Sequence, residues 1–310
     1  MRALVAAPSA PGGIELRDVD EPVPANGVAV VEVRACSLNR GECSELLIAE
    51  DGWRPGWDVA GVIAGPALDG SSPPAGTRVI AWANGGGWAE RVAVRSGHLA
   101  PTPDGLSFET ASTLPVAGLT ALGTLAFGGS LDGSSVAITG AAGGVGRFAV
   151  QLAHDAGAKV TAVVGTPERG EGLRELGADD VVVGLEAKGE PFDLILESAG
   201  GPSLAAALVR ISPDGTVVSI GNSSKEPTTF DARGFYRRGR PTLRGYFATY
   251  ELLEGGLGTG ELARLVELVS SGQLRVEVGL VVPWIDAASA VMALLERRVR
   301  GKAVLTVGSS

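Results

Sequence analysis

Residues that hold metals or form disulfide bonds are scarce in this sequence. Its 310 residues include two cysteines, Cys36 and Cys43, and two histidines, His98 and His154. Two cysteines in one short segment do not make the disulfide framework of a secreted protein, which favours a reducing, cytoplasmic location. Because zinc needs three or four Cys, His or carboxylate donors, this supply of ligands also argues against a zinc-dependent protein.

Long hydrophobic runs and an excess of positive charge are lacking as well. No apolar stretch reaches the roughly 18 residues of a membrane-spanning helix, and the start, MRALVAAPSAPGG, is too short in apolar residues for a secretory signal. The formal net charge of −9 argues against a nucleic-acid-binding surface. With 45% hydrophobic and 20% charged residues, the composition indicates a soluble globular protein of one large or two medium domains. We therefore expect neither a membrane nor a nucleic acid as a partner.

Strand and helix patterns divide the sequence into two kinds of region. The first third contains short β-like runs separated by proline and glycine clusters, at residues 28–35, 59–65, 77–83 and 88–94. From residue 135 onward, apolar strands alternate with helices. The expected helices lie at 109–126, from 145, and at 168–177, 203–211, 261–272 and 287–298. Uniformly apolar strands interleaved with helices imply a parallel sheet covered on both faces, so the predicted fold class is α/β with a β-rich part.

A glycine-rich turn joins the strand SVAIT to the helix that starts at Val145. Gly143, Gly144 and Gly146 lack side chains, so the backbone there lets a pyrophosphate approach closely. The helix that follows offers N–H groups and a partial positive charge at its N-terminus. Ala141 stands where the usual first glycine would be, which makes this a variant of the fingerprint. With a strand before it and a helix after it, the turn predicts a dinucleotide site; the alternative is a tight turn that binds nothing.

The end of the next strand indicates which nicotinamide cofactor binds. An NAD site usually has an Asp or Glu there, which holds the ribose hydroxyls. Here the strand KVTAVV runs into Gly165 and Thr166, and Arg169 follows shortly after. A guanidinium pairs with the 2′-phosphate of NADPH, whereas a carboxylate repels it. We therefore predict NADPH. Glu168 complicates this because it could cap the helix or touch the ribose, and the alternative for Arg169 is a solvated residue at a helix start.

Segments along nearly the whole sequence resemble one superfamily of oxidoreductases. The segments PGWDVAGVIAG, TLPVAGLTAL, TGAAGGVGRFAVQLA, LRELGADDVV, FDLILESAGG, GTVVSIG and GKAVLTV occur in the order of the medium-chain dehydrogenase/reductase superfamily. They most resemble its zinc-free quinone oxidoreductase branch, the zeta-crystallin-like proteins. The resemblance implies a GroES-like β domain built from residues 1–117 and 247–310. It also implies a Rossmann domain, with a doubly wound parallel sheet, over residues 118–246.

The resemblance also bears on metal binding. Zinc alcohol dehydrogenases of this superfamily place a Cys and then a His-Glu pair at the catalytic site. In this sequence the Cys position resembles Asn39 of ACSLNRGE, and the His-Glu pair resembles Trp57 and Asp58 of PGWDVAG. Tryptophan has no lone pair for zinc and asparagine is a poor ligand, so the resemblance implies a mechanism without zinc.

Matching motif positions suggest which residues contact the cofactor. By resemblance, Asn39 lies near the nicotinamide and hydrogen-bonds the cofactor or the substrate oxygen; the alternative is an Asx-turn residue. Thr120 resembles the residue at the nicotinamide-side phosphates, and its alternative is a hydroxyl bonded back to its own helix. Gly221 and Asn222 fall at the strand end that the cofactor should cross. Phe247 either packs near the nicotinamide or belongs only to the sheet edge.

A nicotinamide without a metal points to hydride transfer to an electron-poor acceptor. The leading hypothesis is an NADPH-dependent reductase of quinones. The alternatives are the same chemistry on an enone or enoyl thioester, as in polyketide pathways, and a non-catalytic NADPH-binding protein. No proton donor can be identified, and Lys302 of GKAVL either reaches a cofactor phosphate or is a surface lysine. The family usually pairs subunits through the last Rossmann strand, here near residues 242–249, so the resemblance implies a homodimer.

Overall fold

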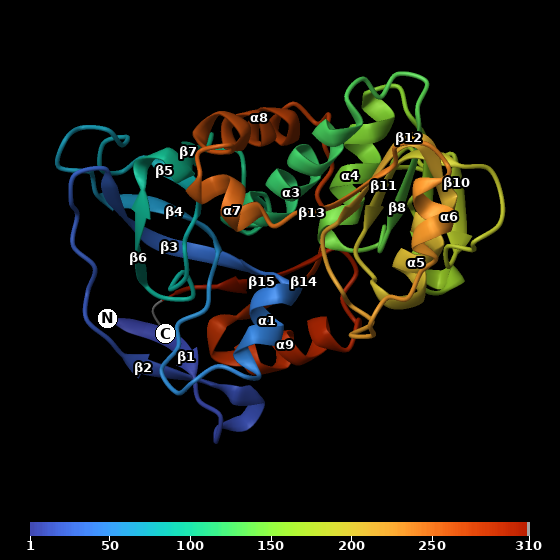
Figure 1. Cartoon of the computed structure of the whole chain (residues 1–310). Helices are drawn as coiled ribbons and strands as arrows, with labels where there is room; N and C mark the ends of the chain where they lie inside the picture. Colours follow the sequence, from blue (N-terminus) through green and yellow to red (C-terminus); the bar gives the residue numbers. More distant parts are fainter. Residues whose placement is uncertain (309–310) are drawn as a thin grey trace. The chain divides into compact units, whose positions relative to one another are not determined.

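A computed structural model of the chain describes residues 1–308, which form two compact units (Figure 1). The β unit consists of residues 1–119 together with the chain from Thr249 onward, and the α/β unit consists of residues 120–248. Each unit is built on its own main sheet. Within residues 1–308, no helix combines the length and the apolar character needed to cross a membrane.

The β unit is built on a seven-stranded sheet with the order β14-β15-β3-β4-β5-β7, in which β6 also pairs with β3. Its strands are β3 (Val28–Leu38), β4 (Asp58–Gly65), β5 (Arg78–Trp82), β6 (Arg91–Arg95), β7 (Leu99–Pro101), β14 (Val278–Pro283) and β15 (Lys302–Thr306). A separate antiparallel pair is formed by β1 (Arg2–Ala6) and β2 (Ile14–Asp18). Because β15 pairs antiparallel with β3, the C-terminal segment completes a sheet that the N-terminal third begins.

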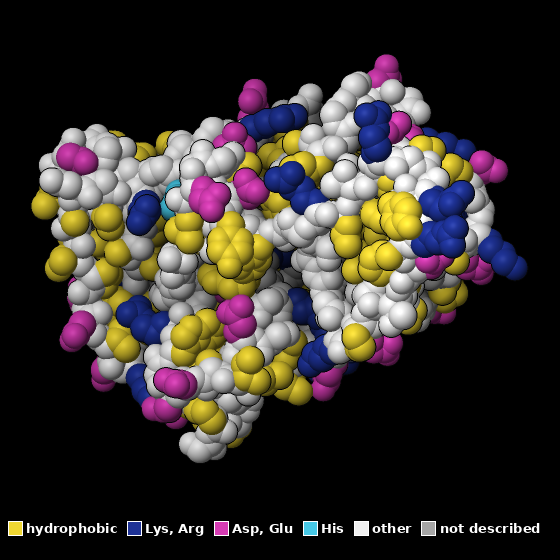
Figure 2. Space-filling view, viewed as in Figure 1, with side chains coloured by type: hydrophobic (Ala, Val, Ile, Leu, Met, Phe, Trp, Pro, Cys, Tyr) yellow, Lys and Arg dark blue, Asp and Glu magenta, His cyan; other side chains and the backbone are white. Residues whose placement is uncertain are grey.

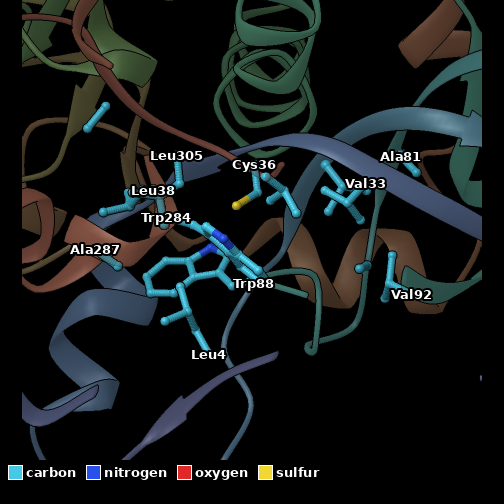
Figure 3. Close-up of a cluster of buried hydrophobic side chains, with 14 of the residues drawn as sticks. Leu4, Val33, Cys36, Leu38, Ala81, Trp88, Val92, Trp284, Ala287 and Leu305 are labelled. Carbon is cyan, nitrogen blue, oxygen red and sulfur yellow. The ribbon is translucent and has the colours of Figure 1, made fainter. Parts of the chain in front are cut away.

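The core of the β unit contains two tryptophans surrounded by aliphatic side chains. Trp88 is fully buried and Trp284 is almost so, and Figure 3 shows their rings together, with Leu4 and Ala287 nearby. Cys36 of β3 belongs to the same cluster, and burial raises the pKa of its thiol well above the ordinary range. Full burial of each large apolar side chain contributes roughly 1.5–3 kcal/mol, so this cluster anchors the unit.

Helices and short 3₁₀ turns connect these strands. The α-helices of the β unit are α1 (Arg40–Leu46), α2 (Phe108–Ser112), α8 (Thr259–Ser270) and α9 (Ala287–Leu295), while α3 (Pro115–Leu125) and α7 (Ala248–Leu253) run across the unit boundaries. The 3₁₀ helices of the chain lie at Pro11–Gly13, Ser96–His98, Ala126–Gly128, Pro167–Gly170 and Trp284–Asp286. Helix α8 buries Leu262, Leu265 and Val266, the spacing of one apolar face.

The α/β unit contains a six-stranded parallel sheet with the order β10-β9-β8-β11-β12-β13. Its strands are β8 (Ser135–Thr139), β9 (Lys159–Val164), β10 (Asp180–Val183), β11 (Phe192–Glu197), β12 (Ile211–Ser219) and β13 (Thr242–Gly245). Its α-helices are α4 (Gly144–Asp155), α5 (Gly201–Arg210) and α6 (Ala232–Tyr236). The chain leaves β8 toward one edge of the sheet and later returns to β11 and the other edge. In sheets of this kind, ligands bind beyond the carboxyl ends of the two strands at which the order reverses.

The predicted α/β class, with a parallel sheet and a β-rich part, is confirmed, but two helix predictions are wrong in detail. Residues 168–177 form no α-helix; the Pro167–Gly170 3₁₀ turn is followed by further turns. Gly172 and Gly177 adopt φ values of 75° and 101°, which a right-handed helix does not allow. The segment 109–126 forms two helices, α2 and α3, instead of one. Pro115 begins α3 and disfavours a helical conformation in the residue before it.

Candidate active site

Two glycines of the turn after β8 are required by the packing of the protein itself. A Cβ on Gly146 would lie 2.5 Å from Ala141 Cα, so helix α4 could not sit this close to the turn with any other residue. Gly140 has a φ of 62°, and a Cβ there would lie 2.5 Å from Ser198 Oγ. Both glycines therefore have a structural explanation that needs no ligand.

Two other glycines of this region are less constrained by packing, and Gly165 is not constrained at all. Gly165, the first residue after β9, is exposed, and a Cβ there would meet no atom within 4 Å. Gly143 is the N-cap of α4 in an extended conformation, and its Cβ would meet only Gly140 O, at 3.3 Å. Within the described residues no side chain caps α4, so the N–H groups of Gly144 and Val145 begin the helix uncapped. An open backbone at a helix N-terminus fits the pyrophosphate of a dinucleotide.

The turn after β9 carries the residues expected to distinguish NADPH from NADH. Thr166 and Glu168 are exposed, and Arg169 is half-buried in the 3₁₀ turn. Hydrogen bonds from its own backbone N–H and from the Thr166 side chain hold the pKa of Glu168 below its usual range. Glu168 is therefore folded back onto its own turn, which answers part of the question that the sequence left open.

Strand β11 contributes a buried carboxylate to the same edge of the sheet. Glu197 is fully buried, and its carboxylate accepts hydrogen bonds from Ala199 N (3.0 Å), Gly200 N (2.9 Å) and Thr139 Oγ1 (3.3 Å). Ser198 N donates to Thr139 Oγ1 at 2.8 Å. The ends of β8 and β11 are thus tied together at the point where the strand order reverses. Sequence reasoning missed Glu197, although an acidic residue at the end of an apolar strand was the available signal.

The segment after β12 lies at the same edge of the sheet as the ends of β8 and β11. Ser223 N donates to Ser198 O, and a Cβ on Gly221 would lie 3.2 Å from that same oxygen. Asn222 is exposed, and its Oδ1 accepts a hydrogen bond from Ser224 Oγ at 3.0 Å. The structure therefore brings Gly221 and Asn222 to the end of β11.

Thr120 and Phe247 lie on other elements. Thr120 is buried in α3, where its carbonyl accepts from Thr124 Oγ1 at 2.6 Å. Phe247 is 46% exposed and follows edge strand β13, next to Tyr246, whose ring meets Phe127 edge-on at 5.9 Å. Three strand spacings, about 14 Å, separate β13 from β8. The sheet order alone therefore does not bring Phe247 to the glycine turn.

The β unit contains a polar cluster centred on Asn39. Asn39 is the N-cap of α1 and forms a capping box with Glu42: Asn39 N donates to Glu42 Oε1 at 2.8 Å. Its Nδ2 donates to Glu42 Oε1 (3.1 Å) and to Asp58 Oδ2 (2.8 Å), and its Oδ1 accepts from Lys302 Nζ (2.7 Å). The lysine can only donate and the carboxylates accept, so the amide orientation is fixed. Both amide hydrogens are used, and Oδ1 is the atom with a lone pair to spare.

Lys302 and Asp58 form the buried centre of this cluster. Their side chains are 5% and 0% exposed, and Nζ lies 3.1 Å from Asp58 Oδ2. Lys302 Nζ also donates to Leu38 O at 3.2 Å, so all three N–H groups have acceptors. Asp58 additionally accepts from Ser37 Oγ (2.7 Å) and Val116 N (2.7 Å). The surface-lysine alternative for Lys302 is therefore wrong, and sequence reasoning assigned no role to Ser37.

Glu42 is a second buried carboxyl group beside this pair. Its Oε2 accepts from Gly56 N (3.1 Å) and Trp57 N (3.0 Å). Burial, and then the charge of Asp58, raise the pKa of Glu42 to about 8, against the N–H donors and Lys302, which favour the charged form. The carboxyl groups of Glu42 and Asp58 and the ammonium of Lys302 therefore share a site that is almost closed to water.

The two histidines do not join either site. His98 is buried, and its Nε2 lies 3.1 Å from Leu252 O, while His154 is exposed on α4. Within residues 1–308, no group of three or more His, Cys, Asp or Glu side chains is arranged to hold a metal ion.

A parallel sheet whose strand order reverses beside an open glycine turn is typical of dinucleotide-binding folds. The comparisons with known proteins specify the family. The family model described as "Zinc-binding dehydrogenase" matches residues 144–270. The chloroplast envelope quinone oxidoreductase homolog of Arabidopsis thaliana is 32% identical over 67% of this chain and 70% of that protein. The chain belongs to the medium-chain dehydrogenase/reductase superfamily, in its quinone oxidoreductase-like branch.

Other relatives extend over almost the whole chain. The synaptic vesicle membrane protein VAT-1 homolog of Homo sapiens is 28% identical over 95% of this chain and 83% of that protein. The spectinabilin polyketide synthase system protein NorB of Streptomyces orinoci is 32% identical over 97% of this chain, which spans 13% of that protein's length. The match to the polyketide synthase protein therefore concerns one part of a much longer polypeptide.

Solved structures share the fold. A mycobacterial protein complexed with NADPH has a TM-score of 0.88 and 23% identity, covering 99% of this chain and 100% of that one. The enoyl reductase CurK has a TM-score of 0.84 and 21% identity, covering 99% of both chains.

Proposed function

We propose that this protein is an NADPH-dependent oxidoreductase that transfers hydride to a quinone without zinc. The observations that carry the proposal are the open backbone at Gly165, where a Cβ would meet no atom within 4 Å, and the uncapped N-terminus of α4. NADPH, when bound, supplies the hydride. The uncapped N-terminus of α4 binds the pyrophosphate, and Gly221 and Asn222 line the adjoining edge.

Residue 165 supports NADPH over NADH. A carboxylate at this position would hold the ribose hydroxyls of NAD, and here the position has no side chain. Arg169, four residues further on, pairs with the 2′-phosphate in this proposal.

Lys302 supports the zinc-independent mechanism. Its ammonium lies 2.7 Å from Asn39 Oδ1 and 3.1 Å from Asp58 Oδ2, two of the positions that resemble the metal-binding residues of zinc alcohol dehydrogenases. A positive charge at these atoms repels a divalent cation, and each atom already accepts a hydrogen bond from the ammonium. The cluster then serves to hold Asn39, whose Oδ1 accepts a hydrogen bond from the bound ligand.

A second candidate is an NADPH-dependent reductase of an enone or enoyl thioester. The relative that favours it is the polyketide synthase system protein, to which this chain is 32% identical over 97% of its length. Both candidates use the same hydride transfer and differ only in the acceptor.

The experiment follows the oxidation of NADPH by its absorbance with a panel of quinones, enones and enoyl thioesters. Faster oxidation with quinones supports the first candidate, and faster oxidation with alkenes supports the second. Oxidation of NADPH by no acceptor, with NADPH binding intact in a fluorescence titration, would favour a non-catalytic NADPH-binding protein. In the same titration, Arg169→Ala should weaken NADPH binding far more than NADH binding.

The proposal includes a cytoplasmic homodimer. Strand β13 is the edge of the parallel sheet and all four of its residues are exposed, so a second copy could cover it.

A further inference from the structure

Arg54 is a half-buried arginine without a carboxylate partner. Within residues 1–308, its guanidinium makes no hydrogen bond or ion pair, and its Nε is closed to solvent. Two other half-buried arginines of the β unit are paired: Arg2 with Glu90 at 3.2 Å and Arg17 with Asp51 at 2.7 Å. Arg54 therefore differs from Arg2 and Arg17 in having a charge that the protein leaves unmatched.

The backbone holds Arg54 against a glycine loop. Segments 54–57 and 83–88 are joined by backbone hydrogen bonds, among them Gly86 N to Arg54 O (3.0 Å) and Ala83 N to Trp57 O (2.7 Å). A Cβ on Gly86 would lie 3.5 Å from an Arg54 guanidinium nitrogen, so the side chain packs over this glycine. Gly86 has a φ of 77°, which only glycine adopts without strain. The fold therefore fixes the backbone of Arg54 and places its guanidinium against Gly86.

Leaving a guanidinium partly desolvated and unpaired is unfavourable. Burial accordingly lowers the pKa of Arg54. The chain has 35 Asp and Glu residues, so it does not lack acids to pair with this arginine. The arginines at and just after α6, such as Arg233 and Arg237, are exposed and remain hydrated, and dark-blue side chains gather there in Figure 2. Arg54 is the position at which an anion from outside the chain would relieve the penalty.

We propose that Arg54 forms an oxyanion subsite, so that the acceptor reduced by this protein carries a carboxylate or phosphate group. The inference rests on the proposed function, because it assigns the anion to the acceptor. Arg54 precedes Asp58 by four residues, which separates their backbones by at most about 14 Å. The backbone N–H of Trp57, between them, already donates to Glu42. The proposed subsite and the polar cluster around Asn39 are therefore built in part from one short stretch of the chain.

The glycine loop also carries a polar side chain, which the proposal includes in the subsite. Asn84 is exposed at the start of the loop on which Arg54 packs. Its amide can donate to an oxyanion that the planar guanidinium binds through two parallel N–H groups.

The first test uses a quinone with a carboxylate side chain, its methyl ester and its phosphate-bearing analogue. In Arg54→Met, the KM for both anionic quinones should rise about tenfold or more with little change in kcat, and the KM for the ester should not change. Arg54→Lys should lie between. Arg17→Met, which removes a paired arginine of the same unit, is the matched control and should leave all three KM values unchanged. The anionic quinone whose KM rises more in Arg54→Met shows whether the subsite takes a carboxylate or a phosphate.

The second test is binding without turnover. Trp53 and Trp57 flank Arg54, so titration with each anionic quinone should quench their fluorescence in the wild type and much less in Arg54→Met. If the wild type binds the anion through Arg54 but reduces no acceptor, the subsite stands and the proposed function fails. If the carboxylate and its ester are reduced with equal KM, the proposed function stands and the subsite is overturned. Equal effects of Arg54→Met and Arg17→Met would also overturn it.

Discussion

Lys302 Nζ lies 3.1 Å from Asp58 Oδ2 in the interior of the β unit, although the two residues are 244 positions apart in the sequence. The pair links the C-terminal strand β15 to strand β4. Asn39 accepts a hydrogen bond from Lys302 and donates one to Asp58. Buried ion pairs contribute little net stability compared with apolar residues, but removing one partner leaves a charge without compensation. The pair is therefore sensitive to single substitutions.

Lys302→Met should lower the free energy of unfolding by about 3 kcal/mol or more, because Asp58 and Glu42 would then share a buried site without a cation. Urea denaturation followed by circular dichroism measures the change. The control is Arg240→Met, which removes an ion pair with Asp214 whose side chains are 90% and 70% exposed. This control should cost less than about 1 kcal/mol. Equal losses in the two variants would contradict the structural role of Lys302.

Because of Glu42, the free energy of unfolding should fall as the pH rises above the ordinary pKa of a glutamate. Its pKa is about 8 in the folded chain against 4.5 ordinarily, because burial and then Asp58 disfavour the charged form. Between these values the folded chain keeps a proton that the unfolded chain has lost. The free energy of unfolding contributed by this group is therefore complete below pH 4.5 and declines until about pH 8. Urea midpoints measured between pH 5 and 8.5 test this decline.

The control for the pH experiment is Glu42→Gln, which cannot titrate. His98 also titrates in this window, and burial lowers its pKa, so its contribution has the opposite sign. The difference between wild type and Glu42→Gln removes the histidine from the comparison. Parallel pH profiles for the two proteins would show that Glu42 does not hold a proton at neutral pH.

The sequence allows prediction of the strands and the glycine turn because their signals are local. Apolar runs of four to six residues become β8, β9 and β11, and Gly143 lies at the start of α4. The helix predicted at 168–177 fails because its apolar spacing is overridden by glycines with positive φ, Gly172 and Gly177. The buried state of Lys302 could not be predicted, since its partner Asn39 is 263 positions away. Local patterns thus locate the glycine turn but not the polar cluster.

Gly165→Asp should shift the cofactor preference from NADPH toward NADH. A Cβ at this position meets no atom within 4 Å, so the substitution fits the fold. A carboxylate directly after β9 repels a 2′-phosphate and accepts hydrogen bonds from ribose hydroxyls. The ratio of the two dissociation constants, from fluorescence titration, should change by about tenfold or more. Gly165→Asn has the same shape without the charge and should change the ratio much less; a similar change in both variants would place the 2′-phosphate elsewhere.

Removal of metal ions should leave the activity unchanged. The ammonium of Lys302 already bonds to Asn39 Oδ1 and Asp58 Oδ2, so no zinc ion is needed to organise these atoms. The measurement compares NADPH oxidation before and after dialysis against a strong chelator, with metal content determined in parallel. Activity that is lost with the metal and returns with added zinc would refute the zinc-independent mechanism.

Strand β13 should form the interface between two copies of the chain. Its residues Thr242–Gly245 are exposed, it pairs with β12 on one side, and Leu243 is 43% exposed. An edge strand with exposed apolar side chains associates readily, and a lysine there opposes pairing. Analytical ultracentrifugation should give twice the mass of one chain for the wild type and the mass of one chain for Leu243→Lys. Leu253 of α7 is similarly exposed, at 42%, so Leu253→Lys is the control and should remain dimeric. A monomeric wild type, or equal dissociation by both substitutions, would exclude β13 as the interface.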